Sequence, residues 1–269
     1  MANKKTKSVA LISLILAIVL ILTAIIVVLV KGYRFTTYDD GARFVGSVKS
    51  GQPYSGKVKY KNGMTAVLEY SQSKIAYSNG DVYIGEIDTI YRNGKGTLTY
   101  AATKDKYEGE FKNDLIWGFG KYTYSDGSYF EGNFVNGVKE GYGKFVVVKD
   151  GVPTGEQYSG QYVNDMLNGQ GEYVSADKSY SYIGNFVNDV QNGSGKCTYA
   201  NGDTYIGDFL NNQRHGYGVY TWVNGESYAG NFINNARDTR ILDKNGKYAL
   251  DEEGNYIHGE KATFKYKDG

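Results

Sequence analysis

One long apolar run stands at the start of a chain that elsewhere alternates polar and apolar positions. From Val9 to Val30 the only polar residues are Ser13 and Thr23. In a helix with a rise of about 1.5 Å per residue, this run spans roughly 33 Å, which is enough to cross the hydrocarbon core of a bilayer. The run is longer than the apolar region of a cleavable signal peptide, and no small-residue cleavage site follows it. We therefore expect one uncleaved transmembrane helix over residues 9–30.

The charges beside this run favour one orientation. Three lysines precede it within residues 1–8, whereas Lys31 and Arg34, which follow it, are soon joined by two aspartates. Flanks rich in Lys and Arg stay in the cytoplasm. The sequence thus predicts a single-pass protein of the cell membrane, with residues 1–8 cytoplasmic and everything after residue 31 extracytoplasmic.

Beyond residue 80 the alternation becomes a repeat. Each copy begins with an aromatic residue followed two positions later by glycine, and the copies start 24, 23, 28, 24, 23 and 23 residues apart. In the first six copies a Gly-x-Gly pair begins nine positions after the first glycine. The aromatic and glycine positions are Tyr83 and Gly85, Tyr107 and Gly109, Phe130 and Gly132, Tyr158 and Gly160, Tyr182 and Gly184, Tyr205 and Gly207, and Tyr228 and Gly230.

Each copy is typical of a β-hairpin. Side chains alternate with period two, as in Tyr205-Ile206-Gly207-Asp208-Phe209. Asn-Gly or Asp-Gly pairs, which favour two-residue turns with positive φ, recur at residues 79–80, 126–127, 201–202 and 224–225. An insertion at residues 149–155 predicts one lengthened hairpin. Hairpins joined in this way predict an all-β fold, an elongated single-layer antiparallel β-meander.

The same pattern predicts how a single layer is packed. Tyr205 and Gly207 share one face of the first strand, and we place Gly216 and Gly218 together on the ring-bearing face of the second. Glycine weakens a strand, but it also lets an aromatic ring lie flat on the backbone. One Tyr or Phe ring buries roughly 150–250 Å². We therefore expect rings over glycines to replace a second layer.

These residues resemble the MORN repeat family, most closely in Tyr205-Ile206-Gly207-Asp208-Phe209, Arg214-His215-Gly216-Tyr217-Gly218 and Asn224-Gly225-Glu226. The resemblance covers roughly residues 83–235. It implies a twisted, groove-bearing meander of tandem hairpin repeats used for interaction and scaffolding, and phospholipid contact is a role often stated for the family. Together with the apolar run, it implies a bacterial-type membrane-anchored MORN repeat protein.

Outside this core the pattern decays. Phe44-Val45-Gly46 begins an earlier copy, but residues 66–77 lack the triplet, and no Gly-x-Gly follows Asn234. The end units of a repeat array are atypical because they cap it. We therefore expect a juxtamembrane segment with degenerate repeats at 31–82, the MORN repeat core at 83–235, and a degenerate capping repeat at 236–269.

Composition removes several classes of function. The part of the chain after the first three lysines carries 30 − 3 = 27 basic and 29 acidic residues, a charge of about −2, without a basic cluster. Nucleic acid is therefore not an expected partner. The single cysteine, Cys197, excludes an intrachain disulfide and a cysteine-based zinc site, and its repeat slot predicts a core residue. We expect no metal and no cofactor.

No residue set predicts catalysis. His215 occupies a slot that holds Asn, Trp or Glu in the other copies, so it carries no common chemistry. Glu108, Glu110 and Glu131 could form a carboxylate pair of the glycosidase kind, but solvated strands carry such acids routinely. We therefore expect no catalytic residue and no enzyme.

A single layer leaves some rings accessible, and such surfaces bind partners. The expected binding surface contains Trp117, Tyr142, Tyr162, Tyr217 and Trp222, although Trp222 also fits a place in the core. The sequence predicts a membrane-anchored interaction module that binds a protein partner or a second copy of itself. A module for glycans of the cell envelope, or a domain that contacts phospholipid, is the alternative.

Overall fold

The computed structural model describes residues 2–30, 32–240, 247, 249–257 and 263–266. The chain divides into two compact units, residues 1–115 and residues 116–269. Each unit is described by itself below.

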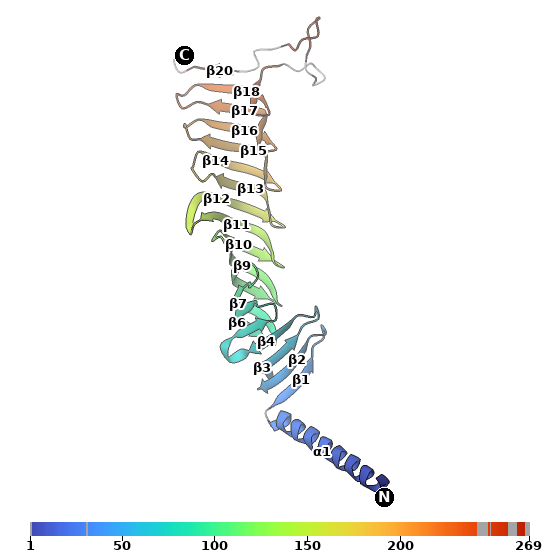
Figure 1. Ribbon diagram of the computed structural model, residues 1–269. Coiled ribbons are helices and arrows are strands. Elements are labelled where there is room, and N and C mark those ends of the chain that lie inside the picture. Colours follow the sequence, from blue (N-terminus) through green and yellow to red (C-terminus); the bar gives the residue numbers. More distant parts are fainter. Residues whose placement is uncertain (1, 31, 241–246, 248, 258–262, 267–269) are drawn as a thin grey trace. The chain divides into compact units, whose positions relative to one another are not determined.

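The first unit joins one helix to an antiparallel sheet. Each of its eight strands pairs with the next along the chain (Figure 1). A short 3₁₀ turn, η1, interrupts the meander between its fourth and fifth strands. The elements are α1 (Ala2–Val30), β1 (Tyr33–Thr37), β2 (Arg43–Lys49), β3 (Gln52–Lys59), β4 (Thr65–Glu69), η1 (Tyr70–Gln72), β5 (Lys74–Tyr77), β6 (Val82–Asp88), β7 (Tyr91–Thr99) and β8 (Lys106–Lys112).

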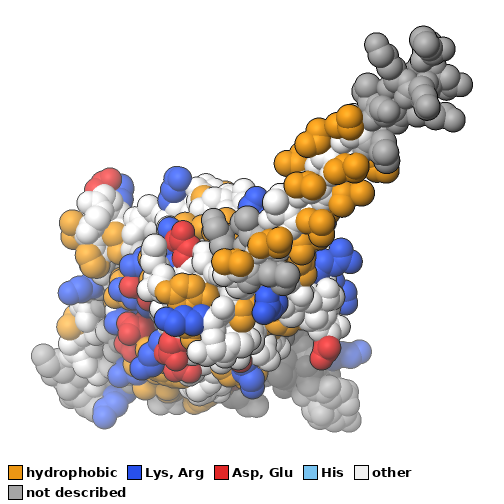
Figure 2. Space-filling view, turned by 90° about the horizontal axis from the view of Figure 1, so that it is seen from below, with side chains coloured by type: hydrophobic (Ala, Val, Ile, Leu, Met, Phe, Trp, Pro, Cys, Tyr) orange, Lys and Arg blue, Asp and Glu red, His pale blue; other side chains and the backbone are white. Residues whose placement is uncertain are grey.

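The helix α1 contains the apolar run, and hydrophobic side chains cover its described part (Figure 2). Among them, Leu20 is 68% exposed and Ile12 is 57% exposed. Among the residues that the structure describes, no helical stretch is both long enough and apolar enough to cross a membrane.

The second unit is a longer meander of the same kind. Its strands β9 to β18 pair in sequence and antiparallel, and β18 pairs along its other edge with both β19 and β20 (Figure 1). The strands are β9 (Leu115–Thr123), β10 (Tyr129–Val135), β11 (Val138–Lys149), β12 (Val152–Val163), β13 (Met166–Val174), β14 (Tyr180–Val187), β15 (Val190–Tyr199), β16 (Thr204–Leu210), β17 (Gln213–Thr221), β18 (Ser227–Ile233), β19 (Ala236–Asp238) and β20 (Thr263–Lys265). Much of the expected capping repeat at 236–269 lies outside the described residues.

The core consists of rings that lie over paired glycines. Gly207 on β16 faces Gly218 on β17, and a Cβ atom at either position would overlap the Tyr205 ring. The Tyr205 hydroxyl then donates a 3.0 Å hydrogen bond to the carbonyl of Asp208, three residues ahead on its own strand. This carbonyl lies where the strand register shifts between Gly207 and Phe209. We call this arrangement of ring, glycine pair and hydroxyl bond the ring clamp.

The ring clamp recurs in both units. Tyr83, Tyr182 and Tyr228 are fully buried and donate in the same way to the carbonyl three residues on. Phe44 and Phe130 cover glycine pairs without a hydroxyl, so Phe44-Val45-Gly46 does begin an earlier copy of this packing. The expectation that rings over glycines replace a second layer is therefore confirmed.

Neighbouring clamps are joined by rings from the next hairpin. Tyr205 meets Phe209 of its own strand and Phe232 of the following repeat, both edge-on, at centroid distances of 5.3 and 4.9 Å. Tyr182 contacts Phe186 and Phe209 in the same manner. Such edge-to-face pairs contribute about 0.5–1.5 kcal/mol beyond the area they bury. The clamps therefore form a continuous ladder of rings through these repeats.

One repeat departs from this ladder. The Tyr158 ring is half-buried and its hydroxyl donates to Glu156, so it does not lie over its own glycines. A Cβ atom at Gly171 would meet the Phe186 ring instead, at 3.1 Å. Among the described rings, none links Tyr162 to Phe186. The ladder is thus interrupted at the repeat that follows the lengthened hairpin, whose strands β11 and β12 are extended and joined at residues 150–151.

Turns lie at the predicted Asn-Gly and Asp-Gly pairs, but they are not the two-residue turns expected there. At Asn201-Gly202 only the glycine has a positive φ, and Tyr199 bonds to both Gly202 and Asp203, which is a three-residue loop. Two-residue turns with both φ values positive occur at the opposite end, as at Asn211-Asn212. The same turn recurs at residues 113–114, 136–137, 164–165, 188–189 and 234–235. Asn and Asp tolerate this conformation, which is why glycine is not required there.

These turns also bind each hairpin to the one before it. The amide of Asn212 donates to the carbonyl of Gln191, and the amide of Gln191 donates back to the Asn212 side-chain oxygen at 2.8 Å. Asp114, Asp189 and Asn235 make the same reciprocal pair with earlier repeats. We call these pairs the turn-to-turn bonds. At Gln191 they satisfy backbone groups that lie beyond the last pair of the β15–β16 ladder, Gly193 with Phe209.

The placement of Gly216 on the ring-bearing face was wrong. Its φ is +68°, and a Cβ atom there would meet the Asp208 side chain at 3.2 Å rather than a ring. The register shift in this hairpin inserts residues into β17 and turns Gly216 away from the core. The glycines that admit the ring are Gly207 and Gly218.

Gly218→Ala tests the ring clamp. The added methyl group overlaps the buried Tyr205 ring, so we expect the free energy of unfolding to fall by about 2–3 kcal/mol. Urea unfolding of the full chain, followed by tryptophan fluorescence, measures the change. Gly225→Ala is the matched control, because a Cβ there meets no atom within 4 Å and only its φ of +92° is strained. That variant should lose about 1 kcal/mol, and equal losses would contradict the clamp.

The turn-to-turn bonds are tested by a pair of variants in one turn. Asn212→Gly removes the acceptor of the Gln191 amide, whereas Asn211→Gly relieves a similar positive φ and leaves that hydrogen bond in place. We expect Asn212→Gly to be less stable than Asn211→Gly by about 1 kcal/mol, the net worth of one hydrogen bond. The same urea titration measures both. Indistinguishable midpoints would show that the side-chain bond adds nothing.

Candidate functional site

A row of half-buried rings crosses the second unit beside the clamps. Neighbouring rings in this row lie 4.6 to 6.5 Å apart, centroid to centroid, mostly tilted. Each ring retains solvent exposure, unlike the clamp rings. We call this row the aromatic strip; it consists of Tyr122, Tyr124, Phe145, Tyr158, Tyr173, Tyr180, Tyr199, Tyr220 and Trp222.

Two carboxylates fix hydroxyls of the strip. Asp203 accepts from the Tyr220 hydroxyl at 2.6 Å and from the Val223 amide at 2.9 Å. The hydrogen bond from Tyr220 holds the pKa of Asp203 below its usual value, and burial raises the pKa of Tyr220 to about 12. Glu156 accepts from the hydroxyls of both Tyr158 and Tyr173. The strip is therefore neutral at its hydroxyls and held in place near physiological pH.

Cations lie over the rings between the strip and the clamps. The Arg214 guanidinium stands 5.2 Å from the Tyr220 centroid and 5.4 Å from that of Phe232. Arg237 lies 5.9 Å from the Trp222 centroid, and Lys139 lies over Phe130 at 5.1 Å. In the first unit, Arg92 occupies the same repeat slot and contacts Phe111. Cation–π contacts of this kind contribute about 0.5–2 kcal/mol each.

The predicted binding residues do not form one surface. Tyr142 and Tyr217 are each 59% exposed and Trp117 is half-buried. Tyr162 is only 5% exposed and packs edge-on against Phe130, so its assignment as an accessible ring was wrong. Its position in the repeat is that of the buried Phe186 and Phe209, a slot in the core. Only Trp222 belongs to the aromatic strip.

The residues considered for chemistry are scattered. Glu108 is exposed and ion-paired with Lys106, while Glu131 stands opposite two lysines on neighbouring strands. His215 has a buried Nδ1 without a hydrogen-bond partner. Cys197 is fully buried, as its core assignment predicted, and burial raises the pKa of its thiol. Among the described residues, no group of three or more His, Cys, Asp or Glu side chains is placed to hold a metal ion.

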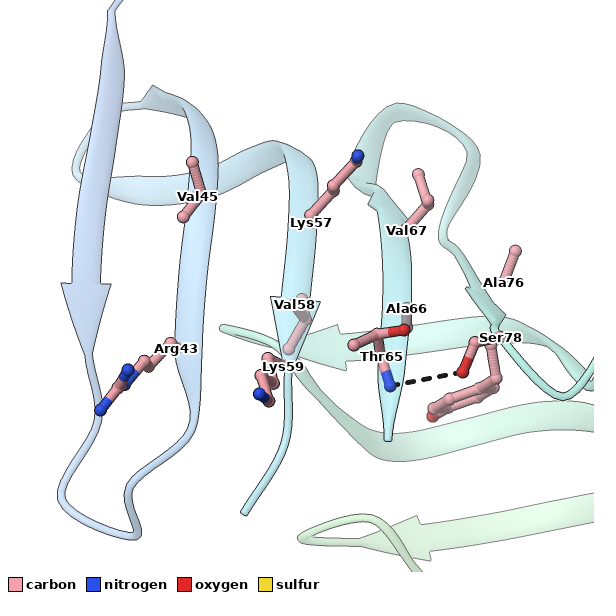
Figure 3. Close-up of a pocket in the computed structure, with 11 residues that line it drawn as sticks. Arg43, Val45, Lys57, Val58, Lys59, Thr65, Ala66, Val67, Ala76 and Ser78 are labelled. Carbon is pink, nitrogen blue, oxygen red and sulfur yellow. Dashed lines mark hydrogen bonds between the residues drawn. The ribbon is translucent and has the colours of Figure 1, made fainter. Parts of the chain in front are cut away.

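A concave face in the first unit forms a pocket of about 710 Å³ (Figure 3). Residues of β2 to β5 line it in register, with Val45 opposite Lys57 and Lys57 opposite Val67. Its lining contains three cations, Arg43, Lys57 and Lys59, and no acidic side chain (Figure 3). The floor is apolar. None of the predicted binding residues lines this pocket.

A second, smaller pocket of about 380 Å³ lies in the same unit. Its lining includes Arg92 and Asp114, whose Nε and Oδ1 atoms are 3.3 Å apart. Burial raises the pKa of Asp114, and the adjacent Arg92 opposes that shift. The Tyr77 hydroxyl, also on the lining, is buried without a hydrogen-bond partner.

Sequence reasoning missed the aromatic strip as a continuous feature. Its members follow the Gly-x-Gly pairs or the loops between hairpins, and they come together only because antiparallel strands bring position 199 beside positions 180 and 220. Tyrosines at these slots were visible, but they were interpreted as core filling. Arg92, Lys139, Arg214 and Arg237 stand at the ninth position after the aromatic residue that begins their copy, in four of the seven copies, a spacing that could have revealed the cation slot.

Comparison with known proteins identifies the repeats. The MORN repeat family model matches residues 83–102, 107–129, 130–146, 158–180, 182–204 and 205–227. Alsin of Rattus norvegicus is 31% identical over 166 residues, which cover 54% of this chain and 10% of Alsin. MORN repeat-containing protein 3 of Xenopus laevis is 31% identical over 102 residues, covering 38% of this chain and 34% of that protein. The chain thus spans about a tenth of Alsin and a third of the Xenopus protein.

Among solved structures, the TCP10 domain of Danio rerio CPAP in complex with a STIL peptide is similar with a TM-score of 0.40 and 13% identity. That similarity covers 74% of this chain and 83% of the domain. The six matched repeats coincide with the first six sequence copies, and the copy at Tyr228 lies beyond the last match. The chain is therefore a MORN repeat protein, with its six recognised repeats between residues 83 and 227.

Proposed function

We propose that this MORN repeat protein is a membrane-anchored, non-enzymatic interaction module that binds a protein partner through the aromatic strip. The observation that carries the proposal is the strip itself, nine half-exposed rings in mutual contact beside a rigid core. Tyrosine and tryptophan are the residues enriched at the energetic centres of protein interfaces. Because their orientations are fixed by Glu156 and Asp203, binding costs little side-chain entropy.

Binding fits this surface better than chemistry does. Catalysis needs a unique cluster of groups with perturbed proton affinities around one reacting position. The strip instead repeats one residue type over successive hairpins, and its carboxylates are already engaged by hydroxyls. Repetition of this kind supplies contact area rather than a reaction centre.

The anchor is part of the same proposal. It rests on the sequence from Val9 to Val30, in which only two residues are polar, and on the helix that contains this run. The lysines within residues 1–8 favour a cytoplasmic amino terminus and an extracytoplasmic repeat domain. The strip would then face the cell envelope.

The concave face of Figure 3 favours a second candidate function, contact with anionic phospholipid. Arg43, Lys57 and Lys59 rim an apolar floor in the first sheet that follows α1. Cations close to a bilayer each contribute about 1 kcal/mol of attraction to an anionic leaflet. This face does not involve the aromatic strip, so the two functions can be separated by mutation.

Site-specific photo-crosslinking tests the partner. With p-benzoylphenylalanine in place of Tyr220, cells that make the full chain should yield a discrete protein adduct on irradiation, because this ring lies in the strip. The matched control is Ile206, which is 56% exposed and lies in the same sheet outside the strip. Adducts are measured as mass shifts in immunoblots and identified by mass spectrometry. Equal adducts at both positions would contradict the proposal, and a carbohydrate adduct would favour an envelope glycan.

Topology is tested separately. Protease added to intact cells should remove the repeats after residue 31, and deletion of residues 1–31 should release a soluble, β-rich protein. Immunoblots of protease-treated cells and of sedimented membranes measure both outcomes. Protection of the repeats until lysis would reverse the orientation. If the truncated protein still sediments with membranes, and Lys57→Gln with Lys59→Gln releases it, the phospholipid function is supported.

A further inference from the structure

Arg214 is a half-buried cation without an anionic partner. Its Nη2 donates a 2.7 Å hydrogen bond to the carbonyl of Asn235, while its Nε is buried and has no acceptor. An arginine side chain has five N–H donors, so most of them lack a protein acceptor here. In the described part of the chain, no carboxylate forms an ion pair with Arg214 or with Arg237.

The first unit shows how the same slot is completed when the chain supplies the anion. Arg92 occupies the slot of Arg214, and the turn residue that faces it is Asp114, whose carboxylate pairs with its Nε. At Arg214 the corresponding turn residue is Asn235, which accepts from the backbone amide but carries no charge. The difference of one residue type leaves the guanidinium uncompensated.

The carboxylate bonded to Tyr220, beside Arg214, does not compensate this cation. Asp203 is engaged by the Tyr220 hydroxyl, the Val223 amide and the Asn201 side chain. This anion is therefore supplied with donors, whereas the Arg214 Nε lacks an acceptor. A complementary partner must bring negative charge.

We propose that the partner of the aromatic strip is an acidic, extended peptide segment, whose carboxylates bind Arg214 and Arg237 while its other side chains lie on Tyr199, Tyr220 and Trp222. This inference rests on the proposed function and specifies the chemistry of the same surface. Carboxylates bind guanidinium groups through two parallel hydrogen bonds, which fixes the position of the segment.

The spacing of the two arginines fits an extended chain. They occupy equivalent slots in consecutive repeats, two strands apart, so about 10 Å separates their backbones at the usual strand spacing. An extended segment in the polyproline II conformation advances about 3.1 Å per residue and returns to the same face at every third residue, so acidic residues three positions apart match the two cations. The net charge of the chain is only +1, so long-range attraction of anions does not explain such binding.

Fluorescence anisotropy with a labelled ten-residue poly-glutamate peptide tests this inference on the full chain in detergent. We expect poly-glutamate to bind at least tenfold more tightly than poly-lysine of the same length, and Arg214→Gln to weaken it about tenfold. Lys196→Gln is the matched control, because it removes one exposed positive charge at a position outside the strip and should leave the affinity unchanged. Circular dichroism spectra of both variants establish that they fold.

Three results would overturn the proposal. The first is equal affinity for poly-lysine and poly-glutamate. The second is an equal loss of affinity in Arg214→Gln and in Lys196→Gln. The third is self-association of the chain that is abolished by Arg214→Gln and also by the double variant Glu252→Gln, Glu253→Gln. The last result would identify a second copy, through its acidic residues 251–253, as the occupant. If poly-glutamate does not bind while the crosslinker at position 220 still traps a protein, the acidic-peptide proposal is refuted and the proposed interaction module is retained. Failure of both experiments removes both proposals.

Discussion

The contact between an aromatic ring and a pair of glycines is the constraint on which this sheet depends. A single layer has no opposing sheet or helix to bury its side chains, and glycine in a strand would ordinarily be a weakness. Here the missing Cβ atoms of Gly207 and Gly218 create the space that Tyr205 fills. The ring is covered by its own backbone, and its hydroxyl satisfies a carbonyl that the register shift leaves unpaired.

This packing decides where a binding surface can form. The clamp rings are completely buried, so they cannot contact a partner. The strip rings stand opposite the clamp rings across the strand pairs, as Tyr220 does between Tyr205 and Tyr228. They stay half-exposed, which leaves them available as the aromatic strip. Arg214 touches both sets, because it lies over the clamp ring Tyr205 and the strip ring Tyr220. The buried rings that hold the sheet and the exposed rings that can bind a partner thus lie on neighbouring strands.

Most of the fold could be predicted from the sequence because period-two alternation and a fixed repeat length are local signals. The ring clamp also followed from the shared face of Tyr205 and Gly207. The face of Gly216 was wrong because it depends on a register shift inside the hairpin, which strict alternation does not reveal. The turns were placed correctly but were expected to be one residue shorter than they are. Tyr162 was misplaced although it follows Tyr158 by four residues, as Phe186 follows Tyr182 and Phe209 follows Tyr205, a spacing that marks a core position.

The aromatic strip and the cation slot were harder to predict, because their members lie about twenty residues apart and meet only through strand pairing. The turn residue that faces Arg92 is Asp114, and the one that faces Arg214 is Asn235. These pairings depend on which turn lies beside which strand. A sequence shows these residues but not their pairing.

The interrupted ladder at Tyr158 has a consequence for how the second unit comes apart. In a linear array, each repeat is coupled only to its neighbours, so cooperativity extends as far as that coupling is unbroken. The missing ring contact between Tyr162 and Phe186 weakens one such coupling, while backbone pairing and a turn-to-turn bond continue across it. The unit therefore contains two cooperative blocks, and under mechanical tension this boundary is where the array would yield first.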